Sequence, residues 1–261
     1  MELIRALLIA AIIIVILSGI SVFLGSRGQE KKPARYFLIA TLGAALWTLA
    51  IYFALNVTEA SSNLVHFIIT CIISGVILMD VGLLAFLGYG YKGGRLLTLL
   101  FTVGGTVLIA LLAYDSSLFY SSYDLSQGYI RVIVDHNWHF FALISYFILI
   151  SITHSSYLLR RIEETKNPGF KTGLKIFSIG LSIGGILALL FDLILLTSLP
   201  SLIWIGPLAT IISIMAFYYS VVKYRVLDVS SKWVKVMSSV ILVGVAVIIY
   251  LLAFYVISKV A

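Results

Sequence analysis

The basic residues of this chain are concentrated in alternate connections between its apolar segments. Fifteen of the eighteen Lys and Arg residues follow the first, third, fifth and seventh segments, and only Arg5, Arg131 and Lys259 lie on the other side. An apolar stretch of about 20 residues can cross a bilayer as a helix. Short loops rich in Lys and Arg stay on the cytoplasmic side. The pattern therefore predicts a polytopic membrane protein with both chain ends outside the cytoplasm.

We predict an all-α bundle of eight transmembrane helices in the cell membrane. The apolar segments lie at 3–25, 36–56, 64–90, 96–114, 137–158, 174–197, 202–222 and 236–258. The chain is 61% hydrophobic and 11% charged, whereas soluble domains carry about 25% charged residues. We divide it into a seven-helix membrane domain at 1–229, and a cytoplasmic linker with an eighth transmembrane helix at 230–261.

The net charge of +7 sets the orientation of the loops and favours anionic lipid headgroups, so we expect the bilayer and no nucleic acid as a partner. The single cysteine, Cys71, excludes an internal disulfide. We expect no bound metal and no cofactor.

One outer connection, 114–135, is long enough to form structure of its own. It mixes Ser, Tyr and Asp with an alternating run at 129–134, which is typical of a strand. We expect a small hairpin or cap over the outer face. On the opposite side, Asn167, Pro168 and Gly169 form a turn signal.

Two aspartates fall inside predicted membrane helices, where ionisable groups are costly. Asp80 lies in the cytoplasmic half of the third segment, and Asp192 lies towards the outer end of the sixth. Each could be a ligand contact, a proton site or an ion site. Each could equally be a neutral acid that makes a hydrogen bond between helices.

Histidine and tryptophan side chains gather at the predicted outer rim. His66 begins the third segment, and His136, Trp138 and His139 precede the fifth. Three histidines on one face could bind zinc or sense pH. Anchoring at the headgroup level is the favoured interpretation, because aromatic belts are the norm at this depth. His154, near the inner end of the fifth segment, is expected to snorkel or to pack.

Small residues in the sixth segment, Gly180 and Gly184, predict close helix packing within the chain. No phosphate-binding glycine loop, His-Glu-x-x-His or Gly-x-Ser-x-Gly motif is present. The seventh segment has no lysine that could form a retinal Schiff base. We therefore expect no enzymatic activity.

Several short motifs resemble those of a known signalling family. They are the Ala-Leu-Trp run at 45–47, the Asn-Trp-His run at 137–139 that leads into Tyr146, the polar Asp192 late in the sixth segment, and the Lys-Tyr-Arg-Val-Leu-Asp run at 223–228. Over about residues 1–229 the chain resembles the seven-helix amino-terminal membrane region of bacterial and archaeal sensor histidine kinases and diguanylate cyclases.

The resemblance implies a signal-receiving module. Because no kinase or cyclase follows the apolar segments, we expect a non-enzymatic, receptor-like sensor or regulator that binds a ligand at its outer face or within the bundle. Its signal would pass to a cytoplasmic or membrane partner, and a homodimer is a further candidate. We expect the ligand residues to be His66, His136, Trp138, His139, Asp192 and Trp204. We expect the partner contacts to be Lys223, Arg225, Asp228 and Lys232.

Two other functions stay open at this point. Eight spans and two intramembrane aspartates, Asp80 and Asp192, also permit a transporter of ions or small molecules. A membrane-embedded enzyme acting on lipid is the third hypothesis, and it would need a cluster of polar residues at one depth.

Overall fold

The computed structural model describes most of the chain. The described residues are 2–57, 61–91, 93–115, 118–125, 130–134, 137–190, 203–227 and 229–230, and eleven positions between 232 and 253. Three of the predicted site residues, His136, Asp192 and Asp228, lie outside them.

The described part of the chain forms a helical membrane bundle, as predicted. The helices are α1 (Glu2–Gly25), α2 (Lys31–Ala54), α3 (Ser62–Leu87), α4 (Gly94–Tyr114), α5 (Trp138–Glu164), α6 (Pro168–Leu189) and α8 (Ile205–Tyr224), and a 3-10 turn, η1 (Gly28–Glu30), precedes α2. Six of these helices are long and apolar enough to cross a membrane, and α8 contains a shorter apolar stretch. This confirms a multi-pass, all-α membrane protein.

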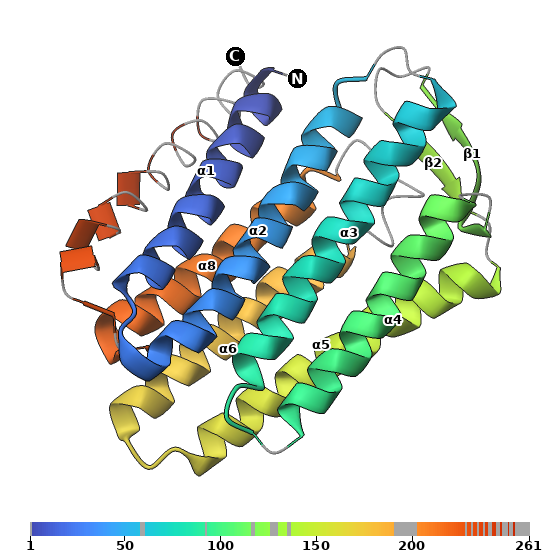
Figure 1. The fold of residues 1–261 in the computed structure, drawn as a ribbon. Helices are drawn as coiled ribbons and strands as arrows, with labels where there is room; N and C mark the ends of the chain where they lie inside the picture. Colours follow the sequence, from blue (N-terminus) through green and yellow to red (C-terminus); the bar gives the residue numbers. More distant parts are fainter. Residues whose placement is uncertain are drawn as a thin grey trace.

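Consecutive helices run up and down, so the basic connections collect at one end (Figure 1). We call this the inner end, and we call the opposite end, which carries the start of α1, the outer end. The described positions between 232 and 253 are helical, in line with the eighth predicted segment. The crossing of that segment, and hence the count of eight spans and the sides of the termini, stay predictions.

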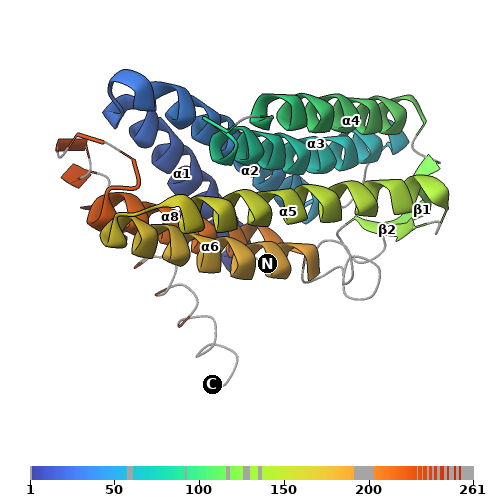
Figure 2. The ribbon, with the colours of Figure 1, turned by 90° about the horizontal axis from the view of Figure 1, so that it is seen from below.

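The helices form two layers (Figure 2). Helices α1 to α4 lie on one side, and α5, α6 and α8 lie on the other. Within the layers, α2 packs closely on α3 and α6 packs closely on α8. Gly43 and Gly75 permit the first approach, because a Cβ at either position would overlap the backbone of the facing helix. Gly180 and Gly184 permit close packing of α6 on α8, because a Cβ there would overlap the Ala216 and Ser213 side chains, and this confirms their predicted packing role.

Asparagine side chains begin two of the helices. The side-chain oxygen of Asn167 accepts hydrogen bonds from the backbone N–H groups of Gly169 (3.0 Å) and Phe170 (3.2 Å), with Pro168 at the first helical turn. This is the predicted turn, and it satisfies donors that a helix start leaves unpaired. Asn137 caps α5 in the same way through Phe140.

The outer connection folds into an antiparallel hairpin of β1 (Tyr120–Asp124) and β2 (Arg131–Val134). Two hydrogen bonds attach it to the bundle. The Ile130 N–H donates to the Ala54 carbonyl at the end of α2 (2.9 Å), and the Asn137 amide donates to the Leu118 carbonyl (2.7 Å). The predicted strand and hairpin are confirmed, and they lie beside the outer ends of α3 and α4 (Figure 1).

Candidate ligand-binding cavity

Asp80 lies on α3 between the two helix layers, where it borders two adjoining hollows. We call the hollow towards the inner end, of about 270 Å³, the inner cavity, and the hollow towards the outer end, of about 170 Å³, the outer cavity. Met79, Ser151, Gly185 and Ala188 also line both. Among the described residues, no side chain forms a hydrogen bond or ion pair with the Asp80 carboxyl group. The carboxyl group therefore faces the hollow.

Polar side chains from four helices line the inner cavity. They are Thr41 of α2, Ser151, His154 and Ser155 of α5, Ser182 of α6, and Thr210 and Ser213 of α8, in addition to Asp80. These side chains give the inner cavity a partly polar lining. A space of this size holds several waters or part of an organic ligand.

The outer cavity is nearly apolar and lies beneath the hairpin. Phe119, Tyr120 and Val132 close it from the outer connection. Trp47 is fully buried in its wall, and the Trp47 indole N–H has no hydrogen-bond partner among the described residues. Because buried donors are nearly always paired, this N–H is a candidate contact for a ligand.

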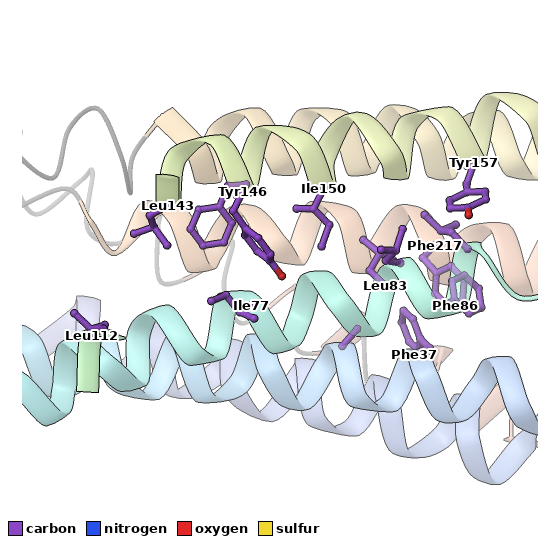
Figure 3. Close-up of a cluster of buried hydrophobic side chains, with 14 of the residues drawn as sticks. Phe37, Ile77, Leu83, Phe86, Leu112, Leu143, Tyr146, Ile150, Tyr157 and Phe217 are labelled. Atoms are coloured by element: carbon purple, nitrogen blue, oxygen red, sulfur yellow. The ribbon is translucent and has the colours of Figure 1, made fainter. Parts of the chain in front are cut away.

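An aromatic cluster closes the inner end of the hollow. It consists of Phe37, Phe86, Phe177 and Phe217, one each from α2, α3, α6 and α8. The Phe217 ring centre lies 4.1 Å from that of Phe37, 5.4 Å from that of Phe86 and 5.0 Å from that of Phe177. Figure 3 shows Phe37, Phe86 and Phe217 gathered at one end of the core, away from Leu143 at the other. The cluster joins the two layers at this end.

His154 links the two layers beside Asp80. Its side chain is buried, and its Nε2 lies 3.0 Å from the backbone carbonyl oxygen of Asp80. A carbonyl oxygen only accepts, so Nε2 carries the proton and Nδ1 is left as an acceptor. The predicted packing role of His154 is confirmed. Its place beside Asp80 was not predicted, although counting residues from the inner loops puts both at similar depths.

The predicted ligand residues that the structure describes, His66, Trp138, His139 and Trp204, are not among the residues that line either cavity. The His66 ring donates to the Ala113 carbonyl over 3.3 Å. Trp138 is 68% exposed and stacks on His139, with ring centres 3.5 Å apart. Trp204 packs against α1 and α2. Within the described residues, no three His, Cys, Asp or Glu side chains form a group that could hold a metal.

The segment that leaves α8 at the inner end is held by both layers. Ser220 donates from its hydroxyl to the Gly173 carbonyl of α6 (2.7 Å), and the Ser230 N–H donates to the Gly25 carbonyl of α1 (2.9 Å). Val226 and Leu227 are buried between these attachments. We call residues 220–230 the exit segment.

The predicted partner residues around the exit segment that the structure describes are Lys223, Arg225 and Lys232, and all three are exposed. The Lys223 ammonium donates to the Tyr219 hydroxyl (2.7 Å). Arg225 has a φ of 52°, in the left-handed region, where the chain turns out of α8. A basic, exposed surface therefore surrounds the end of α8.

Residues 6–230 match the family model described as the N-terminal 7TM region of histidine kinase. The matched residues include both cavities, the hairpin and the exit segment. Searches of curated proteins and of solved structures found no significant match.

Proposed function

The chain belongs to the family of N-terminal 7TM regions of histidine kinases, and from this membership we propose that it is a receptor-like prokaryotic sensor that signals through a partner. Membership of this family indicates a membrane sensor domain. We assign that domain to residues 1–229, and we assign residues 230–261 to a linker and a further membrane helix. The ligand site that we propose is the hollow around Asp80, and the sensor itself carries out no catalysis.

The observation that carries this proposal is the carboxyl group of Asp80, which lies in a hollow between two helix layers and has no partner among the described residues. An ionisable group inside the hydrocarbon region is costly, and it usually marks a functional site. Side chains that border a hollow also make fewer van der Waals contacts with protein, and such contacts are the main force between helices in lipid. A ligand that fills the hollow would supply a partner for the Asp80 carboxyl group and packing contacts for the cavity walls. If it binds one conformation of the bundle more tightly than another, it shifts the equilibrium towards that conformation.

The exit segment offers a route from this site to the partner. Helices α6 and α8 supply walls of the inner cavity through Gly185 and Ser213, and Ser220 and Gly173 join the same two helices at the inner end. A ligand that moves α6 and α8 against α2 and α3 would therefore move the exit segment. We propose that the partner contacts Lys223, Arg225 and Lys232, which are exposed in or beside the exit segment, together with Asp228, which lies outside the described residues.

The outer-rim residues His66, His136, Trp138, His139, Asp192 and Trp204 remain a second proposal for ligand contact. They would act at the outer end, where the hairpin covers the outer cavity. Alanine at His139, compared with asparagine at Asp80, would test whether the rim or only the central hollow controls a response.

A filled cavity can be imitated without knowing the ligand. Gly185 lines both cavities, and a Cβ built there meets no atom within 4 Å. We expect Gly185→Trp to imitate an occupant and to move the exit segment by about 2 Å, a usual size for helix shifts in signalling. Spin labels at Lys31→Cys and Lys232→Cys, both exposed sites, in a Cys71→Ser background would measure the distance.

Ile183→Trp is the matched control, because Ile183 also lies on α6 but is 45% exposed and is not among the described wall residues. It should leave the distance unchanged. Equal distance distributions for Gly185→Trp, Ile183→Trp and the parent would contradict coupling between the cavity and the exit segment.

One observation favours a transporter as the second candidate function. The two cavities adjoin along the bundle axis and share an intramembrane carboxyl group, Asp80, as a transport path would require. Flux of a small cation into proteoliposomes that disappears in Asp80→Asn would support a transporter. A leak-free protein whose exit segment still responds to Gly185→Trp would support the sensor.

A further inference from the structure

We propose that the hollow around Asp80 binds a membrane-dissolved amphiphile with an ammonium head group, which reaches Asp80 between α5 and α6. This inference rests on the proposed sensor function and specifies the ligand class for the same site. It depends on the hydrogen-bonding character of the walls, on the apolar outer cavity and on an opening towards lipid.

The inner cavity offers hydrogen-bond acceptors and few donors. Most of its hydroxyl protons are already used by backbone carbonyl groups. Thr41 donates to Leu38 (2.8 Å), Ser155 to Ser151 (3.0 Å), Thr210 to Pro207 (2.5 Å) and Ser213 to Gly180 (3.1 Å). Each of these hydroxyl oxygens keeps lone pairs that can accept. His154 likewise donates from Nε2 to the backbone carbonyl oxygen of Asp80 and keeps Nδ1 as an acceptor.

These acceptors line the same cavity as the carboxyl group of Asp80, which has no partner among the described residues. An ammonium group carries a positive charge and three donors, so it matches both features. A charged donor to a carboxylate forms one of the stronger hydrogen bonds in proteins. A carboxylate ligand would instead bring a second negative charge to Asp80, and an alcohol would supply only one neutral donor.

The outer cavity suits a hydrocarbon tail. Its walls include Ile69, Ile72, Val76, Leu143, Phe147 and Ile203, and it meets the inner cavity at Asp80. A molecule whose head group pairs with Asp80 could therefore extend its apolar part beneath the hairpin. Burying such a tail here also replaces contacts that the hollow lacks.

The inner cavity reaches the surface of the bundle on the side of α6. Ile186 lines the cavity and yet is 65% exposed, and Ser182 and Ser155, which also line it, are exposed on α6 and α5. The neighbouring surface residues Ile152 and Ile179 are apolar, as expected for helices that face lipid. A ligand dissolved in the bilayer can therefore reach Asp80 without crossing the hairpin at the outer end.

The test compares three head groups on one tail with the full chain in phosphatidylcholine nanodiscs. Decylamine, decanol and decanoate would be titrated at neutral pH, where an alkylamine is protonated because its pKa resembles that of lysine, about 10.4. Binding would be measured by calorimetry, with protein-free nanodiscs to subtract partition into lipid. We expect decylamine to bind at least about tenfold more tightly than decanol, the ratio that one strong charged contact supports.

Two variants identify the site. Asp80→Asn keeps the shape and removes the charge, and should abolish the preference for decylamine over decanol. Ile186→Trp should slow decylamine association, whereas Ile183→Trp, on the same helix but outside the described walls, should not. Equal affinities for decylamine and decanol in the parent protein would overturn the proposal even if no variant folded. So would an amine preference that survives in Asp80→Asn.

The same titrations separate this inference from the sensor function. If decanol or decanoate binds best and changes the distance between the Lys31 and Lys232 labels, the ammonium class is wrong and the sensor stands. If none of the three probes binds, the ligand class is again wrong, and the Gly185→Trp comparison still decides the sensor function independently.

Discussion

The contact between α2 and α3 and the space between α5 and α6 are opposite solutions to packing in a membrane. At the first, Gly43 and Gly75 bring two backbones together with no room for a Cβ. At the second, Gly185 lies beside a hollow into which a Cβ would fit freely. Lipid is as apolar as leucine, so helices associate through packing and hydrogen bonds rather than through burial. The comparison teaches that α2 and α3 form a rigid pair, whereas α5 and α6 border a region that an occupant can change.

The strongest test of this difference is to replace one glycine at the α2–α3 contact and one beside the hollow with larger residues. We expect Gly75→Leu to separate α2 from α3 and to cost more than about 4 kcal/mol, because the side chain would meet the Trp47 backbone. Gly185→Ala should stay within about 1 kcal/mol of the parent and is expected to be stabilising, because alanine favours helix. Thermal unfolding in detergent would measure both, and similar losses for the two variants would contradict the distinction.

The aromatic cluster is expected to give the next largest effect. Phe217→Ala removes the ring that contacts Phe37, Phe86 and Phe177, and it should cost about 3 kcal/mol through lost packing. Phe141→Ala is the control, since Phe141 is 53% exposed on α5 and faces lipid. Denaturant titration would compare them. An equal cost for the two changes would mean that the cluster does not hold the layers together at the inner end.

The attachment of the exit segment should give a smaller effect. Ser220→Ala removes the hydroxyl bond to the Gly173 carbonyl, which joins α8 to α6, and should cost about 1 kcal/mol, the net contribution of a typical hydrogen bond. It should also broaden the distance distribution between the Lys31 and Lys232 labels. Ser156→Ala removes only a bond within α5 on an exposed face, and should change neither quantity. An unchanged distribution in Ser220→Ala would remove Ser220 from the proposed route.

The smallest expected effect lies in the inner loop between α3 and α4. Burial raises the pKa of the Tyr91 hydroxyl, and the Glu164 carboxylate raises that pKa further. The resulting stabilisation is complete below the ordinary tyrosine pKa of about 10 and is lost as the pH rises through the raised pKa of the folded state. As the pH rises above about 10, the stability of Tyr91→Phe should therefore fall less than that of the parent protein. Thermal unfolding at a series of pH values would measure this. Tyr114→Phe, at a 90% exposed site, should behave like the parent.

Several features of the site could be predicted from residues and several could not. The depth of Asp80 and the presence of an outer hairpin followed from hydropathy and alternation along the chain. The hydrogen bond between His154 and the Asp80 backbone did not, because it joins residues 74 positions apart. The predicted ligand residues at the outer rim, including Trp138 and His139, were chosen for their chemistry at one depth, and sequence alone does not say which way each side chain turns.

The sequence by itself determined the membrane bundle, the approximate bounds of the described helices, and the grouping of basic loops at one end. These depend on segment length, hydropathy and charge, which are local properties of the chain. The tertiary structure alone decided that Asp80 faces a hollow, that Trp47 borders its outer part, and that four phenylalanines close its inner end. The physical reason is that helices in lipid are apolar all round, so no amphipathic stripe shows which side faces a neighbour. Rotation about each helix axis, and therefore the site, is settled only when the helices pack.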